Sequence, residues 1–242
     1  LVVNGQKVAV RLVPSGILRP HVRCLLASNV VIDPDALVGE INELKAIGIE
    51  VTPARLGIAR EANLILPFHR LVDAAREECA IGSSKIGTTK RGVGPAYEDL
   101  VGRRGIRMAD LLDTKRLEAR VLASYTYAKI QVEQGCKVKF DLSLADVMEK
   151  LQIFAKFIKP YLVDVGDEIS KAKSAGKKII FEGAQGTMLD VTHGTYPYVT
   201  SSHTVAASAC VSAGVGTQFI DYVLGVVKAY CTRVGEGPFP TE

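Results

Sequence analysis

The sequence lacks any C-x-x-C pair, and its five cysteines are odd in number and widely separated. Disulfide frameworks and zinc sites both need closely spaced or evenly paired cysteines, so this pattern argues against either. It favours reduced, mostly buried thiols in a cytosolic protein, with a reactive cysteine as the less favoured alternative. The cysteines are Cys24, Cys79, Cys136, Cys210 and Cys231.

Long apolar runs and long basic runs are also absent. No uninterrupted apolar stretch reaches the roughly 20 residues that a membrane-spanning helix needs, and the first residues do not resemble a secretion signal. The formal net charge is only +4 over 242 residues, a mild basicity that ordinary solubility explains. We therefore expect a cytoplasmic protein that binds neither membranes nor nucleic acids.

A phosphate-binding loop of the form GxxxxGK[ST] is missing as well. The only Gly-Lys pair in the chain is Gly176-Lys177, and it lacks the upstream glycine of that motif. This absence makes a P-loop kinase a poor interpretation of the chain.

The patterns that are present predict an α/β protein with a mostly parallel central sheet flanked by helices, because short apolar segments alternate with helical periodicity. Hydrophobic residues make up 48% of the chain, which is enough for a large core. We expect residues 1–242 to form one α/β domain, with a helical satellite at approximately residues 108–176. Extended segments are predicted at residues 7–13, 22–27, 29–32, 63–66, 178–181 and 222–230.

Helix boundaries are clearest near the N-terminus. Asp33 before Pro34 is a typical helix start, and Gly48 is a typical stop. A second helix is expected to begin at Pro67, and the Lys159-Pro160 pair should end a later one.

Residues 181–216 organise the chain. They follow a predicted buried strand at residues 178–181 and open into Gly183, Gly186 and Gly194, where the backbone can approach an anion closely. Hydroxyl side chains gather downstream at residues 200–204. This combination suits a phosphate and a polar ring, and the alternative is a glycine-rich connection with satisfied turns.

A second glycine-rich stretch, residues 82–105, is too long for an idle connection. It contains the motif Thr88-Thr89-Lys90-Arg91-Gly92, whose hydroxyls, amides and cations can hold a monophosphate. A basic group, residues 103–107, follows it, and arginines pair with phosphate or carboxylate. Solvated surface loops remain the alternative for both.

Three segments carry a resemblance to a known family. FEGAQGTMLD with HGTYPYVTSS, then IGTTKRGVGPAYEDLVGRRGIRMADL and VKAYCTRVGEGPFPTE, resemble adenylosuccinate synthetases, which join IMP and aspartate. The matches span the chain in the family's order. The resemblance implies a P-loop-NTPase-like fold that is incomplete here.

The resemblance also implies roles for individual residues. Thr89 and Thr200 match threonines that bind the IMP phosphate, and Gln185 matches the glutamine that faces the six-position of the purine, the reacting centre. Arg103 matches an arginine that reaches IMP from the partner subunit of a homodimer. Val234 matches a position near the ribose. The chain departs from the family at Leu100, Thr192 and His203.

By this resemblance the parent protein is a ligase that forms a C–N bond. GTP phosphorylates O6 of IMP, then the L-aspartate amine displaces phosphate, usually with Mg²⁺. The family's phosphate loop, catalytic aspartate and histidine, aspartate-binding loop and guanine-reading motif are missing between Leu1 and Glu242, so both ends look cut. We expect this chain to carry much of the IMP site, to hold no metal ligand and to be inactive alone. A non-catalytic IMP-binding module and a structural fragment are the alternatives.

Other polar residues in the organising stretch are expected to have structural roles. His193 is interpreted as a structural or solvated histidine rather than an acid. Glu182 and Asp190 lack a second ligand at metal-binding spacing, which favours hydrogen-bonding roles for both.

Overall fold

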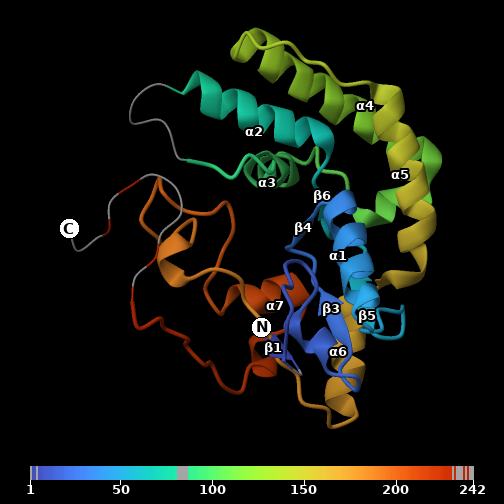
Figure 1. The fold of residues 1–242 in the computed structure, drawn as a ribbon, viewed down its shortest axis with the longest axis vertical. Coiled ribbons are helices and arrows are strands. Elements are labelled where there is room, and N and C mark those ends of the chain that lie inside the picture. Colours follow the sequence, from blue (N-terminus) through green and yellow to red (C-terminus); the bar gives the residue numbers. More distant parts are fainter. Residues whose placement is uncertain are drawn as a thin grey trace.

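The computed structural model describes residues 2–3, 5–80, 87–230, 232, 237 and 239. It has short strands in three sheets, surrounded by helices (Figure 1). β3 (Cys24–Leu26), β5 (Leu56–Ala59) and β7 (Leu162–Val163) form a parallel sheet in the order β3-β5-β7. β4 (Val31–Ile32) and β6 (Asn63–Leu64) form a second parallel pair. β1 (Val2–Val3) and β2 (Gln6–Lys7) pair antiparallel.

The helices follow the expected start and stop chemistry. The Asp33 carboxylate accepts the N–H groups of Asp35 and Ala36 at the start of α1, and Gly48, with φ +81°, follows that helix. The α-helices are α1 (Pro34–Ala46), α2 (Pro67–Cys79), α3 (Val93–Val101), α4 (Thr114–Ile130), α5 (Leu144–Ile158), α6 (Val165–Ser174) and α7 (Ser208–Ala213). Shorter turns are 3₁₀-helices η1 (Ser15–Leu18), η3 (Met108–Leu112), η5 (Lys159–Tyr161), η6 (Thr187–Leu189) and η7 (Thr217–Phe219), and π-helix η4 (Gln131–Gly135).

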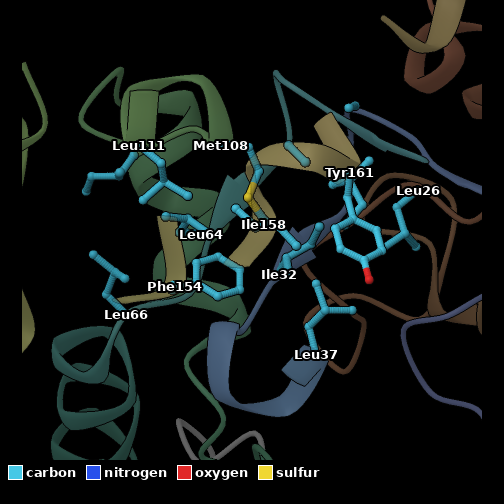
Figure 2. Packing of buried hydrophobic residues seen from close by; sticks show 14 of the residues in the cluster. Leu26, Ile32, Leu37, Leu64, Leu66, Met108, Leu111, Phe154, Ile158 and Tyr161 are labelled. Carbon is cyan, nitrogen blue, oxygen red and sulfur yellow. The ribbon is translucent and has the colours of Figure 1, made fainter. Parts of the chain in front are cut away.

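One hydrophobic core joins the sheets to the helices that cover them. Figure 2 shows Ile32 of β4 and Leu64 of β6 beside Leu37 of α1 and Ile158 of α5. These four side chains have no exposed surface, and burying each contributes about 1.5–3 kcal/mol to folding. The parallel strands with helices packed on them confirm the α/β class.

Three predicted strands are wrong or too long. Residues 178–181 and 222–230 have no strand pairing in the described part of the chain, and Ile180, Val226 and Val227 are each 90% exposed. An apolar run becomes a strand only where a neighbour saturates its backbone, which apolar content alone does not reveal.

The third correction concerns residues 7–13, where pairing stops at Lys7. The N–H groups of Arg11, Leu12 and Val13 instead donate to the buried Glu40 carboxylate of α1. A side chain thus replaces the strand partner. β5 and α3 were not expected from the sequence.

Among the helices that the structure describes, none combines the length and the hydropathy of a membrane span.

Candidate functional site

The last two turns of α2 hold the segment that carries Thr88 and Thr89. The Glu77 carboxylate accepts the Gly87 N–H over 2.9 Å, and Glu78 lies 3.9 Å from the ammonium group of Lys90. Further along, the buried Asp73 carboxylate accepts the Gly92 N–H over 2.9 Å. One helix therefore positions both ends of the threonine segment.

Gly92 cannot be replaced without strain at this place. Its φ is +77°, which L-residues rarely adopt, and it precedes the first turn of α3. A Cβ here would lie 2.8 Å from the backbone of both His69 and Arg70. The chain touches the start of α2 at this point, and that contact directs it into α3.

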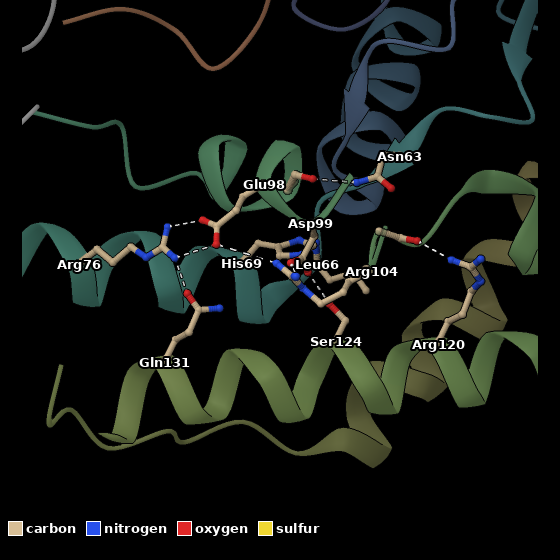
Figure 3. Close-up of polar contacts among 12 residues, drawn as sticks. Asn63, Leu66, His69, Arg76, Glu98, Asp99, Arg104, Arg120, Ser124 and Gln131 are labelled. Carbon is tan, nitrogen blue, oxygen red and sulfur yellow. Dashed lines mark hydrogen bonds and ion pairs between the residues drawn. The ribbon is translucent and has the colours of Figure 1, made fainter. Parts of the chain in front are cut away.

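A buried polar cluster anchors α3 to α2 and α4 (Figure 3). The Leu66 N–H donates to Nδ1 of His69 over 2.9 Å, so the ring proton lies on Nε2 and is donated to Asp99 over 3.2 Å. The Ser124 hydroxyl and the Arg104 Nε–H donate to the same carboxylate over 2.6 and 3.0 Å. Burial alone would raise the pKa of Asp99, but these hydrogen bonds outweigh it and hold the pKa below its usual value.

We call residues 186–205 the Asp190 loop, because the Asp190 carboxylate organises them. The side chain has no exposed surface. Its Oδ1 atom accepts the N–H groups of Thr192 and His193 over 2.9 and 3.0 Å, and Oδ2 accepts that of Thr204 over 2.6 Å. Burial works against ionisation, but these bonds, with one from the Val205 N–H, hold the pKa of Asp190 far below its ordinary value.

The Asp190 loop packs against the first half of α3. A Cβ placed on Gly94 would lie 3.3 Å from the Ser201 hydroxyl, and Ser202 hydrogen-bonds with the Tyr97 hydroxyl, which donates to the Asn29 carbonyl over 2.8 Å. Burial raises the pKa of Tyr97. The N-terminus of a helix favours anions because its first N–H groups have no intrahelical acceptor. Hydroxyl groups therefore gather where an anion is favoured.

Two of the expected phosphate contacts belong to the two segments that meet this end of α3. Thr89 is exposed and precedes the helix, and Thr200 is half-buried beside Ser201, with its N–H donated to the Leu189 carbonyl. Gln185 is exposed and enters the Asp190 loop with φ +62°. Such a conformation is strained for glutamine and is commoner at functional sites.

Arg103 is not brought to the same place. It is exposed and follows the C-terminal end of α3, with φ +61°. A helix of nine residues is about 13 Å long, which separates Arg103 from the threonines. Val234 lies outside the described residues.

Two carboxylates, Glu182 before the Asp190 loop and Asp190 within it, accept hydrogen bonds. Asp190 uses its oxygens on backbone amides, and Glu182 accepts both the N–H and the hydroxyl of Ser15, so both have hydrogen-bonding roles. The His193 side chain is exposed. Within the described ranges, no three His, Cys, Asp or Glu side chains gather as a metal site requires.

Sequence reasoning missed the Asp99 cluster and the part that Glu40 plays. The expectation of one long loop over residues 82–105 concealed α3, and without a helix there was no reason to pair Asp99 with His69. The helical spacing of Pro95, Ala96 and Asp99, which places them on one face, is the signal that was available.

The matches to known proteins extend along the whole chain. The family model described as adenylosuccinate synthetase matches residues 1–242. An adenylosuccinate synthetase of Neisseria meningitidis is 49% identical over the whole chain, which covers 56% of that protein. Adenylosuccinate synthetase 2 of Chromobacterium violaceum is 51% identical over 99% of the chain, which covers 55% of that relative.

A solved structure of similar shape agrees with these matches. Fully ligated adenylosuccinate synthetase from Plasmodium falciparum aligns with a TM-score of 0.87 and 30% identity over 99% of this chain and 55% of its own. This chain thus spans little more than half the length of the relatives it matches.

Proposed function

Because the chain belongs to the adenylosuccinate synthetase family, we propose that the protein joins IMP and L-aspartate into adenylosuccinate, with this chain supplying much of the IMP site. The observation that carries the proposal is the packing of the Asp190 loop on α3. It supports the proposal because the loop that carries Thr200 packs on the first half of α3, and the segment that carries Thr89 leads into the same helix.

The proposed reaction forms a C–N bond in two steps. GTP phosphorylates O6 of IMP, and the aspartate amine then attacks C6 and releases the phosphate. Gln185 is proposed to face the N1–C6 edge of the purine, since an amide side chain both donates and accepts there. Its strained backbone fits a side chain held in one direction toward a ligand. Val234 is proposed to lie near the ribose.

The Asp190 and Glu182 carboxylates are not free to bind Mg²⁺. The Asp190 carboxylate is already occupied by four backbone N–H groups, and Glu182 accepts two hydrogen bonds from Ser15. These residues do not fit a metal site, so the Mg²⁺ and GTP that the reaction uses are proposed to be held outside this segment.

Arg103 is proposed to serve a second subunit. Its place at the far end of α3 from the threonines suits an arginine that reaches the IMP phosphate of a neighbouring copy. The protein would then be a homodimer in the cytoplasm, with each site completed by its partner. Residues 1–242 are proposed to form one incomplete α/β domain, with residues 108–176 as its helical satellite.

The chain by itself is proposed to bind IMP without turnover, because the groups for GTP, for aspartate and for proton transfer have no counterpart in it. A non-catalytic IMP-binding module is the second candidate. IMP- and aspartate-dependent release of phosphate from GTP by the purified 242-residue chain would contradict the expected inactivity.

Calorimetric titration of the chain with IMP, and with GMP as the competing nucleotide, tests the site. We expect IMP to bind preferentially, Thr89→Ala and Thr200→Ala to weaken binding about tenfold each through lost hydrogen bonds to a charged phosphate, and Arg103→Ala to weaken it in the dimer. Thr126→Ala and Arg19→Ala alter exposed residues elsewhere and serve as controls. Equal binding by the threonine variants and the controls, in folded samples, would overturn the site.

A further inference from the structure

Two thiols far apart in the sequence meet at the end of α2. Cys79 is the last residue of α2, and Cys136 follows the π-helix η4. The Cys79 thiol donates to the Cys136 carbonyl over 3.1 Å, so the two residues are in contact although 57 residues separate them. Both are free in this structure.

The surroundings of the pair favour oxidation at one sulfur. Cys79 is exposed and Cys136 is half-buried, whereas Cys24 and Cys210 are buried. Burial, followed by the neighbouring Cys79 thiol, raises the pKa of Cys136. Cys79 is therefore the sulfur that a dissolved oxidant reaches first, and Cys136 is placed to attack it afterwards.

Arg76, a cation near the two cysteines, has two side-chain partners. Arg76 lies one turn before Cys79, and its guanidinium pairs with Glu98 and hydrogen-bonds with Gln131 of η4 (Figure 3). Its charge lowers the pKa of Cys136 in opposition to burial. The same side chain joins α2, which ends at Cys79, to η4, which precedes Cys136.

We propose that Cys79 and Cys136 form a reversible disulfide when the protein meets a hydroperoxide. The Cys79 thiol gives up its proton, and its thiolate attacks one oxygen of hydrogen peroxide. The O–O bond breaks, and the leaving hydroxide takes up that proton, so a sulfenic acid and one water form. The Cys136 thiol then loses its proton and attacks the Cys79 sulfur, which forms the S–S bond and releases a second water. Each hydrogen peroxide is reduced to two waters as two thiols are oxidised, and a dithiol reverses the reaction by exchange. Transient disulfides of this kind are the form found in reducing compartments.

The disulfide would fix the end of α2 against η4. Glu77 and Glu78, the two residues before Cys79, hold Gly87 and Lys90 on either side of the threonine segment. Oxidation would thus restrain the approach to the proposed IMP site. This consequence rests on the proposed function, whereas the disulfide itself does not.

Peptide mapping tests the bond directly. The full 242-residue chain carries Cys231→Ser, which removes the thiol outside the described residues, and is treated with hydrogen peroxide, alkylated and digested with trypsin without reduction. We expect the peptide of residues 77–85 to be linked to that of residues 130–137, with a mass lower by two hydrogens, and dithiothreitol to separate them. The melting temperature should rise on oxidation, since the cross-link restrains the unfolded chain.

Single variants decide between this bond and alternatives. Cys136→Ser should leave Cys79 as an over-oxidised or alkylated residue and abolish the rise in melting temperature, whereas Cys210→Ser should change neither. Linkage of Cys79 to Cys24, Cys210 or a second chain would overturn the proposal, as would two thiols that remain alkylatable in a folded, peroxide-treated sample. If the linked peptide forms but IMP affinity is unchanged, the bond stands and only its consequence fails.

Discussion

Asp190 accepts the backbone N–H of Thr204 on Oδ2 over 2.6 Å, while its Oδ1 atom accepts the N–H groups of Thr192 and His193. One carboxylate therefore joins backbone groups up to 14 positions away in the sequence by charge-assisted hydrogen bonds. Thr200, a proposed phosphate contact, lies inside that loop. The position of the hydroxyl groups thus depends on a residue that is itself buried and out of reach of a ligand.

Replacing this carboxylate should disorganise the loop. In Asp190→Asn, the new NH₂ group cannot accept hydrogen bonds from the backbone N–H groups that face it. We therefore expect a lower melting temperature and IMP binding weakened at least tenfold. Asp141→Asn is the matched control, because Asp141 is 81% exposed and pairs only at the surface. Calorimetry and thermal melts measure both effects. Unchanged IMP binding in Asp190→Asn would show that the loop does not depend on its carboxylate.

Substitution of Gly92, which contacts the start of α2, should also be destabilising. Gly92→Ala forces an L-residue to φ +77° and a methyl group into the backbone of His69 and Arg70, so we expect a loss of at least about 2 kcal/mol in the free energy of unfolding. Gly39→Ala, inside α1 with open space around it, should instead add about 0.5–1 kcal/mol. Urea denaturation compares them, and similar values for the two variants would contradict this account.

Glu40 offers a test of the segment that was expected to be a strand. Its carboxylate accepts three backbone N–H groups, so Glu40→Gln should lower the free energy of unfolding by about 1–3 kcal/mol. Glu43→Gln, one turn further along α1, removes only an exposed ion pair with Arg11 and should cost less than about 0.5 kcal/mol. Denaturant titration separates the two. Equal losses would mean that the Glu40 hydrogen bonds contribute nothing beyond surface charge.

The sequence was informative where local chemistry decides the structure. Asp33 and Pro34 start α1, and Pro160 lies in the turn that ends α5, because caps and proline act within a few residues. The parallel pairing was also predictable from strands that alternate with helices.

Long-range contacts could not be predicted in the same way. Whether residues 222–230 form a strand depends on a neighbouring segment, and the structure leaves Val226 and Val227 exposed. The meeting of Cys79 with Cys136 and of Asp99 with His69 depends on how α2, α3 and α4 pack. At the site, motif resemblance indicated Thr89 and Thr200, but the carboxylates that position them became visible only in the folded chain.

The Asp99 cluster should make the free energy of unfolding fall with pH in the acidic range. The pKa of Asp99 in the folded chain lies below its ordinary value, so the unfolded chain binds more protons near pH 4. The stabilisation is therefore complete above the unfolded pKa of about 3.9 and is lost as the pH falls through it toward the folded pKa. Asp190 shifts in the same direction and adds to the effect.

Asp99→Asn isolates the contribution of this cluster. The amide cannot accept all the hydrogen bonds from His69, Ser124 and Arg104, so at pH 7 we expect a loss of about 2 kcal/mol in the free energy of unfolding. The loss should shrink as the pH falls from about 5 to 3, because the wild-type carboxylate is then protonated as well. Urea titrations at each pH measure this, with Asp141→Asn as the exposed control. A loss that stays constant over this range would mean that Asp99 acts by packing rather than by charge.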